Sequence, residues 1–228
     1  DGPLFRTKTG EITVKAHQIN ILCKSFRGLP EKWHGIQDIE KRYRQRYLDL
    51  ATNQNVKSVF HLRSKIINQI RQFMDKEGFL EVETPTLVPI PSGAMARPFA
   101  THHNSLDQNL FLRIATELYL KRLIVGGFEK VYELSKDFRN EGVDRTHSPE
   151  LTMLECYEAY VDYEDMMTLT ESIVSQLAGK LYGSSLVDTE AWQLDFAPPW
   201  KRISFKAAVA TETGLDIEDY PEAIDLGE

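Results

Sequence analysis

The chain has 228 residues, of which 42% are hydrophobic and 27% are charged, and its formal net charge is −7. This composition is typical of a globular protein, and the acidic balance argues against broad, non-specific binding of nucleic acid while leaving room for a locally basic docking face. No apolar run approaches the ~20 residues of a membrane-spanning helix and the sequence does not open with a secretory h-region, so no membrane segment is expected. Cys23 and Cys156 are expected to be reduced thiols, and a cytoplasmic protein is the default expectation.

The two ends of the chain have distinctive patterns. Residues 4–22 alternate between apolar and polar positions around a turn at 9–10, which predicts short strands of a β-unit too small to be stable alone. Residues 28–37 contain two glycines and a proline and are predicted to form a linker. Residues 212–228 are acidic and lack Lys and Arg, which predicts a solvated, poorly packed segment. Because the chain also begins without methionine, both ends are expected to be cut from a longer protein.

Two helices are predicted after the linker. Residues 56–77 form the clearest helix, ended by Gly78 as a C-cap, because their apolar side chains recur at spacings of three and four. Residues 38–52 also have helical character and carry a basic cluster, which we interpret as a solvated helix face in preference to an RNA contact. The cluster consists of Lys41, Arg42, Arg44 and Arg46.

The rest of the chain predicts an α+β fold with an antiparallel sheet flanked by helices. Thr116 is expected to be the N-cap of a short helix that ends near 126–127. Asp162 is expected to cap a final helix that ends at Gly183 and turns five apolar side chains inward, namely Met166, Leu169, Ile173, Leu177 and Leu181. Strands are expected at 79–85, 110–114, 130–141 and 151–161.

The two strands 130–141 and 151–161 carry an unusual polar pattern. Arg139 and Glu141 share one parity on the first strand, and Leu151, Glu155 and Tyr157 share one parity on the second. In an antiparallel hairpin these side chains can face one surface. That surface is either a solvated sheet face with weak ion pairs or a pocket for a ligand that carries both an anion and a cation.

Several common signatures of catalysis are missing from the sequence. It contains no GxxxxGK[ST] or GxGxxG phosphate loop, no HExxH, no Cys/His zinc spacing and no GxSxG. A bound nucleotide would therefore have to be held by side chains. The neighbouring His102 and His103 are interpreted as structural or surface residues.

Ordered motif blocks carry a family resemblance. This chain resembles motif 2 of the class II aminoacyl-tRNA synthetases in the blocks FRNE at 138–141 and HSPE at 147–150. It resembles motif 1 in GFLEVETP at 78–85. The lysine-specific members are also similar in three further blocks: KRYRQRYLDL at 41–50, SGAMARPF at 92–99 and RIATELYLKRL at 113–123. The likeness runs from about residue 2 to about residue 206. FRxE alone is a weak signal, but several blocks in this order are specific.

The resemblance implies a domain plan and a reaction. Residues 1–27 would be the last strands of an anticodon-binding OB-fold β-barrel, 28–37 the linker, and 38–228 a partial class II catalytic domain with motifs 1 and 2 but no motif 3. The family activates lysine with ATP to lysyl-adenylate and transfers it to lysine tRNA, as a homodimer built on motif 1. The Mg²⁺ ligands of motif 3 are expected beyond the end of this chain, with none within it, so the chain alone is expected to be inactive.

The resemblance also assigns roles around ATP. Arg139 matches the arginine that grips the α-phosphate and the lysine carboxylate, and it is the expected catalytic residue. Glu141 matches the acid that accepts from the adenine amino group, and His147 matches a loop residue near the outer phosphates. Leu151 stands where the family usually has the phenylalanine beneath adenine, so stacking is expected to be weaker here.

For lysine, the resemblance assigns the α-ammonium to Glu117 and the Gly93 backbone, and the ε-ammonium to Glu155 and Tyr157. A desolvated primary ammonium has three donors and requires acceptors, ideally anionic ones. A site for aspartate would place a cation at this position, which favours lysine within the class. One further departure is Thr116, which occupies a position where the family often has proline.

Three other interpretations remain open at this point. A relative that lysylates a protein would lack the OB-fold, and residues 4–22 argue against it. A synthetase-like protein without aminoacylation activity would bind a partner or regulate. An unrelated α+β domain is the plainest alternative.

Overall fold

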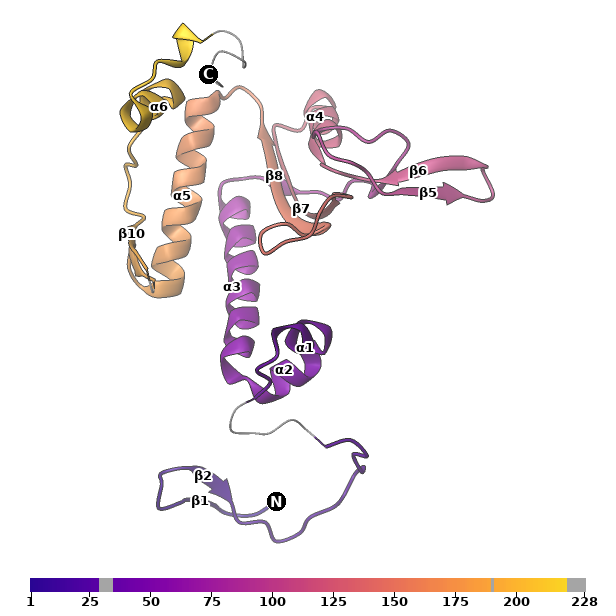
Figure 1. The fold of residues 1–228 in the computed structure, drawn as a ribbon, viewed down its shortest axis with the longest axis vertical. Helices are drawn as coiled ribbons and strands as arrows, with labels where there is room; N and C mark the ends of the chain where they lie inside the picture. Colours follow the sequence, from indigo (N-terminus) through magenta and orange to yellow (C-terminus); the bar gives the residue numbers. More distant parts are fainter. Residues whose placement is uncertain (29–34, 190, 221–228) are drawn as a thin grey trace. The chain divides into compact units, whose positions relative to one another are not determined.

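The computed structural model describes residues 1–28, 35–189 and 191–220. The chain divides into two compact units, residues 1–62 and 63–228. Figure 1 follows the elements in chain order from the β1–β2 hairpin to α6. None of the helices within the described ranges is long and apolar enough to cross a membrane.

The first unit opens with an isolated hairpin. Strands β1 (Leu4–Arg6) and β2 (Ile12–Val14) pair antiparallel, with Leu4 opposite Val14, and most of their side chains are exposed. The alternation expected to continue to residue 22 forms no strand among the described residues 15–28. The OB-fold assignment therefore stays a prediction, and most of the predicted linker, residues 29–34, lies outside the described residues.

The predicted helix 38–52 is two helices, α1 (Ile39–Arg44) and α2 (Arg46–Thr52), separated at Gln45. The fully buried Asp49 organises this break by accepting hydrogen bonds from Arg42 at 2.9 Å and from Arg46 and Asn53 at 2.5 Å each. Burial alone would raise the pKa of Asp49, but these hydrogen bonds outweigh it and hold the pKa below its usual value.

Three members of the basic cluster are thus engaged within the chain. Arg42 and Arg46 bind Asp49, and Arg44 binds Glu40 at 2.9 Å. Arg46 also lies over the rings of Tyr43 and Phe60. These contacts support a structural role for the cluster over an RNA contact.

The predicted helix 56–77 is confirmed as α3 (Gln54–Lys76), which ends before Gly78 in the left-handed region at φ +82°. Its C-terminal end supplies Phe73 and Met74 to the core of the second unit, where they meet Phe79 and Tyr132. The chain then enters β3 (Leu80–Glu81), which is much shorter than the strand expected at 79–85.

A three-stranded sheet in the order β3–β7–β8 forms the centre of the second unit. Strands β7 (Lys130–Phe138) and β8 (Glu150–Glu158) pair antiparallel, with Glu133 opposite Glu155 and Asp137 opposite Leu151. The long polar hairpin is therefore confirmed, although both strands are shorter than predicted. The antiparallel sheet was expected, and the parallel pairing of β3 with β7, which makes the sheet mixed, was not.

A second three-stranded sheet has the order β4–β6–β5. Strand β6 (Gln108–Leu112) corresponds to the strand expected at 110–114, whereas β4 (Leu87–Val88) and β5 (Ala100–His103) were not predicted. β4 has only two residues and β5 is exposed throughout, so neither has the apolar alternation that identifies a strand in a sequence.

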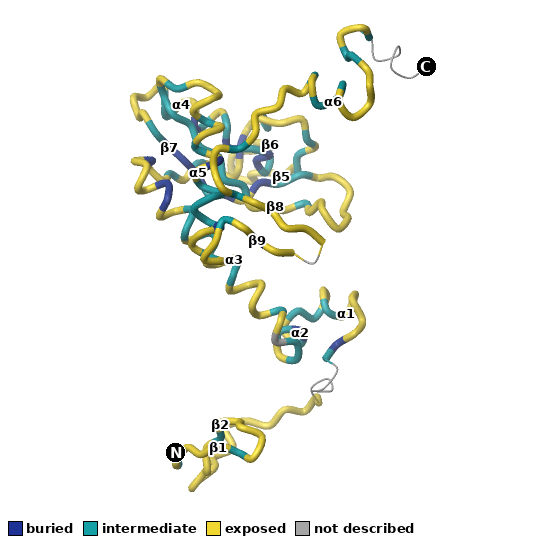
Figure 2. Tube along the Cα trace, turned by 90° about the vertical axis from the view of Figure 1, so that its left-hand side faces the viewer, coloured by how far each residue is buried: buried dark blue, intermediate teal, exposed yellow. Residues whose placement is uncertain are grey.

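The two faces of the central sheet have different neighbours. Tyr132, Leu134, Leu154 and Cys156 share one face with the apolar side chains of α3 and α5, and Figure 2 shows burial concentrated around these strands. The other face carries the polar residues and meets α4 (Glu117–Val125), because the amide of Thr116 donates to Glu155 on β8. The apolar face therefore anchors the sheet and leaves the polar face available for a ligand.

Helix α5 (Tyr163–Tyr182) begins and ends as predicted, with a capping box between Asp162 and Asp165 and with Gly183 in the left-handed region. After it come β9 (Leu186–Asp188), β10 (Gln193–Asp195) and α6 (Phe205–Thr213).

The acidic segment after α6 is partly ordered, contrary to expectation. Residues 217–219 form a 3₁₀ turn, and Lys206 on α6 binds Asp216 at 3.1 Å and Glu218 at 2.5 Å. The lysine supplies the positive charge that the segment itself lacks. Residues 221–228 lie outside the described residues.

A buried arginine ties the two sheets together. Arg113 directly follows β6, and only 5% of its surface is exposed. Its guanidinium lies 2.7 Å from Glu133 and 3.3 Å from Asp137, both on β7. It also donates to the carbonyl oxygens of Lys136 and Thr84 at 3.0 Å each. Burial raises the pKa of Asp137 above its usual value even though Arg113 acts in the opposite direction.

We expect Arg113→Met to lower the free energy of unfolding by about 3–5 kcal/mol, because it leaves the buried Glu133 and Asp137 without their cation. Arg71→Met is the matched control, since the Arg71–Glu81 pair is about half exposed and should contribute ~1 kcal/mol or less. Urea unfolding of the full-length protein measures both. Equal decreases in the free energy of unfolding would show that the buried ion pairs of Arg113 stabilise the fold no more than the exposed Arg71–Glu81 pair.

Candidate functional site

The residues predicted to bind an amino acid come together on the polar sheet face. Glu155 and Tyr157 project from β8, and Glu117 begins α4, whose preceding amide at Thr116 donates to Glu155 Oε1 at 3.2 Å. Gly93 reaches the same place from the loop between β4 and β5. The four positions come from three separate parts of the chain, so their meeting is a property of the fold.

Gly93 is in contact with Glu117. A Cβ added at Gly93 would lie 3.1 Å from Glu117 Cβ and 3.0 Å from Ala115 Cβ, and the backbone there has φ +89°. The left-handed conformation favours glycine, and the close approach leaves little room for a larger side chain. The Gly93 backbone is therefore held against the carboxylate with which it was predicted to act.

The local electrostatics keep Tyr157 protonated. Burial raises the pKa of its phenol first, and the carboxylates of Glu155 and Glu117 raise it further by disfavouring a third negative charge nearby. Tyr157 is consequently a neutral hydrogen-bonding group beside two carboxylates. Such a set provides the acceptors that a primary ammonium requires.

Lys121 also belongs to this cluster, and the sequence interpretation missed it. Its Nζ lies 2.6 Å from Glu117 Oε1 and 5.9 Å from the centre of the Tyr157 ring. The four-residue spacing from Glu117 to Lys121 on one helix was the available signal, but that spacing occurs on many solvated helices.

Thr116 does not act as the side-chain cap that was expected. Its backbone is helical, with φ −97° and ψ −8°, and its side chain makes no capping hydrogen bond. A capping residue is normally extended, which lets its oxygen reach the amides of the first turn. Instead, Thr116 Oγ1 is buried without a partner among the described residues, and the amide is the group that acts, on Glu155.

Arg139 lies just beyond the end of β7, where its amide donates to the carbonyl oxygen of Pro149 at 2.9 Å. Its side chain is half-buried, and its Nε is buried with no partner among the residues that the structure describes. A permanent cation with an unused buried donor is suited to an anionic ligand. Leu151 is half-buried on the same face, opposite Asp137.

Glu141 and His147 occupy the loop between β7 and β8. Glu141 is exposed, and its Oε1 accepts from the amide of Arg97 at 3.4 Å. His147 is exposed in a turn closed by Asp144, which accepts from the His147 amide at 2.8 Å and lies 2.7 Å from its Nδ1. Hydrogen bonds from the Thr146 amide and then the His147 ring hold the pKa of Asp144 far below its usual value. His147 can therefore meet a ligand through Nε2.

Comparison with known proteins identifies the family. Residues 38–225 match the family model of tRNA synthetases class II (D, K and N). The chain belongs to this family. Two of the chain's polar-face strands, β7 and β8, lie within the matched range, as do Gly93 and Glu117.

The similar curated proteins are lysine–tRNA ligases. The chain is 58% identical over 221 residues to the protein from Roseiflexus sp. (strain RS-1), covering 97% of the chain and 45% of that relative. It is 57% identical to those of Roseiflexus castenholzii and Pelotomaculum thermopropionicum, covering 100% and 94% of the chain and 46% and 42% of the relatives. The chain therefore spans less than half the length of the relatives it matches.

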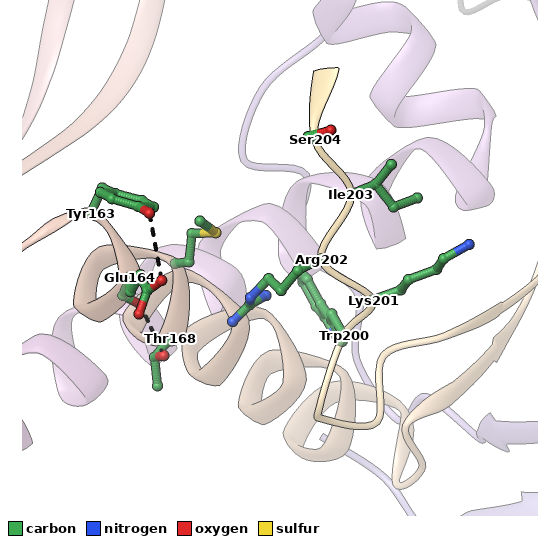
Figure 3. Close-up of a pocket in the computed structure, with 9 residues that line it drawn as sticks. Tyr163, Glu164, Thr168, Trp200, Lys201, Arg202, Ile203 and Ser204 are labelled. Atoms are coloured by element: carbon green, nitrogen blue, oxygen red, sulfur yellow. Dashed lines mark hydrogen bonds between the residues drawn. The ribbon is translucent and has the colours of Figure 1, made fainter. Parts of the chain in front are cut away.

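One cavity of the second unit lies away from the predicted site residues. A cavity of about 650 Å³ lies between the first turns of α5 and residues 200–204, and it contains none of the predicted site residues. Figure 3 shows Tyr163 and Thr168 grouped around Glu164 on one side, with Trp200 and Arg202 opposite. Arg202 is already paired with the buried Glu171 at 2.8 Å.

Class II synthetases use ATP and Mg²⁺ in general, but the described part of this chain does not fit a metal. Residues 1–28, 35–189 and 191–220 contain no group of three or more His, Cys, Asp and Glu side chains placed to hold an ion.

Proposed function

We propose that the chain forms part of a lysine–tRNA ligase, which activates lysine with ATP and transfers it to lysine tRNA. The observation that carries the proposal is the convergence of Glu117, Glu155 and Tyr157 on one sheet face. Similarity to lysine–tRNA ligases from several bacteria supports it. Translation in the cytoplasm is the setting we propose.

The charge balance of the polar face favours an amino acid with two ammonium groups. Arg113 largely neutralises Glu133 and shares its charge with Asp137, while Glu155 has no cation in a salt bridge among the described residues. An incoming ε-ammonium would meet Glu155 and the Tyr157 hydroxyl, and an incoming α-ammonium would meet Glu117 and the backbone of Gly93. A second positive charge on the ligand is needed to match Glu155, which favours lysine over neutral or acidic amino acids.

Arg139 would align the two reacting anions. In adenylate formation, a lysine carboxylate oxygen bonds to the α-phosphorus as the bond from that phosphorus to pyrophosphate breaks. The planar guanidinium can bind the carboxylate and an α-phosphate oxygen together, which lowers their repulsion and fixes the line of attack. The unpartnered buried Nε supports this role.

The remaining predicted residues would hold the nucleotide around Arg139. Glu141 would accept from the adenine amino group, Leu151 would pack beneath the base, and His147 would meet the outer phosphates through Nε2. The Asp144 turn fixes the other ring nitrogen of His147, which supports that assignment.

Lysine-dependent exchange of pyrophosphate into ATP by the full-length protein tests the activity, and charging of lysine tRNA tests the transfer step. Exchange without charging would favour a relative that lysylates another acceptor. Loss of both, with a folded protein, would favour a synthetase-like protein without aminoacylation activity.

We further propose a homodimer built on the segment that follows α3. Three apolar side chains are strongly exposed there, with exposed fractions of 47% for Leu80, 48% for Leu87 and 74% for Ile90. Apolar groups in one exposed stretch are typical of an interface. Sedimentation of the full-length protein at micromolar concentration should give a dimer, and Ile90→Glu should weaken it. A wild-type monomer would refute the assignment.

Glu155→Gln should weaken lysine binding by about 2–5 kcal/mol, because it removes the anion opposite the ε-ammonium but retains an oxygen for the Thr116 amide. ATP affinity should change little. Glu158→Gln is the control on the same strand, since Glu158 pairs with Lys130 at 2.6 Å on the other face. Calorimetry of lysine binding measures both, and equal affinities for wild type and Glu155→Gln would remove Glu155 from the site.

Arg139→Lys should slow adenylate formation by about 100-fold or more, because lysine keeps the charge but loses the two-pronged geometry. Rapid-quench measurement of lysyl-adenylate in the full-length protein gives the rate. The control is Arg97→Lys, which keeps the backbone amide and carbonyl that contact Glu141 and Asn140 and should stay near the wild-type rate. A near-wild-type rate for Arg139→Lys would contradict the role proposed for it.

A further inference from the structure

We infer that Lys121 is a positioning residue for the amino-acid substrate, which fixes the carboxylate of Glu117 so that one oxygen is free for the α-ammonium. The inference rests on the proposed function for the identity of the substrate. It concerns a residue to which neither the motif resemblance nor the proposal above gives a role.

The two oxygens of Glu117 have different surroundings. Oε1 is bound by Lys121 Nζ at 2.6 Å. Oε2 is the oxygen on the Gly93 side, at 3.7 Å from the position of a Cβ built on that glycine. An ammonium held between Glu117 and the Gly93 backbone would therefore meet Oε2, the oxygen that Lys121 leaves open.

Lys121 is itself restrained from a second direction. Its Nζ lies 5.9 Å from the centre of the Tyr157 ring, within the range of a cation–π interaction. The ring is fixed by its position on β8, whereas an exposed lysine on a solvated helix has no such restraint. The cation consequently links Glu117 to Tyr157, so it connects the residues proposed for the two ammonium groups of lysine.

A carboxylate without this restraint would rotate among several rotamers and would lose part of its binding energy to ordering. Glu117 stands at the first position of α4, where no earlier helical turn packs against it on the N-terminal side. Lys121, one turn later, is the nearest helical position that can hold it.

The alternative effect of Lys121 is competition, in which its ammonium excludes the substrate from Glu117. The geometry favours positioning, since Lys121 binds Oε1 and leaves the Gly93 side open. The two effects change lysine binding in opposite directions, so one measurement separates them.

The test is lysine-dependent pyrophosphate exchange by the full-length protein with Lys121→Gln, Lys121→Arg and the control Lys136→Gln. Lys136 is matched in exposure and pairs with Glu150 at 3.0 Å, away from the cluster. We expect Lys121→Gln to raise the KM for lysine by about 3- to 10-fold, as for loss of one charged hydrogen bond, with the KM for ATP unchanged. Lys121→Arg keeps the positive charge, so its KM for lysine should stay close to the wild-type value. Lys136→Gln should leave the KM for lysine unchanged.

A second readout identifies the subsite. 6-Aminohexanoate lacks the α-ammonium, so its inhibition constant should be the same in wild type and in Lys121→Gln. An unchanged or lowered KM for lysine in Lys121→Gln would overturn the inference, and so would an equal loss for lysine and 6-aminohexanoate. If the wild-type protein itself shows no lysine-dependent exchange, the proposed function fails instead.

Discussion

The buried guanidinium of Arg113 is the constraint on which the rest of the second unit depends. It lies where the β4–β6–β5 sheet meets the central sheet, and it binds Glu133, Asp137 and two backbone carbonyls. Because α4 begins four residues later, the arginine also sets where Glu117 approaches β8. Gly93 belongs to the same second-sheet region, so one buried cation indirectly aligns three separate parts of the chain.

The same cluster imposes a cost that a ligand can relieve. Several carboxylates lie together on the polar face. The pKa values of Asp137 and Tyr157 are raised, first by burial and then by the neighbouring carboxylates. A folded protein without ligand must tolerate this repulsion in a partly desolvated place. The two ammonium groups of the proposed ligand would offset this repulsion, so the same charges would supply both the attraction to the ligand and the loss of repulsion among the carboxylates.

Regular amphipathic patterns made part of this structure predictable. Helices α3 and α5 follow from their apolar spacing and caps, and the shared parity of Glu155 and Tyr157 follows from strand geometry. The short strands β4 and β5 carry no such pattern, and the parallel pairing of β3 depends on the tertiary arrangement. The break between α1 and α2 at Gln45 is accompanied by ion pairs of the buried Asp49 with Arg42 and Arg46. Helical periodicity does not predict these ion pairs. The motif resemblance predicted the residues of the candidate site, whereas the contact of Lys121 with Glu117 and Tyr157 depends on the three-dimensional arrangement of α4 and β8.

Thr116 shows how neighbouring positions can become dependent on one another. Its hydroxyl contributes no cap, yet its amide holds Glu155. The family often has proline at this position. A proline would fix the backbone of the first turn of α4, but it has no N–H to donate to Glu155. Proline would therefore give a stiffer start to α4, whereas threonine gives a hydrogen bond from its amide to the carboxylate of Glu155. With threonine at this position, the orientation of the Glu155 side chain on β8 depends on the backbone amide that precedes α4. The effects of substitutions at 116 and 155 should therefore not be additive.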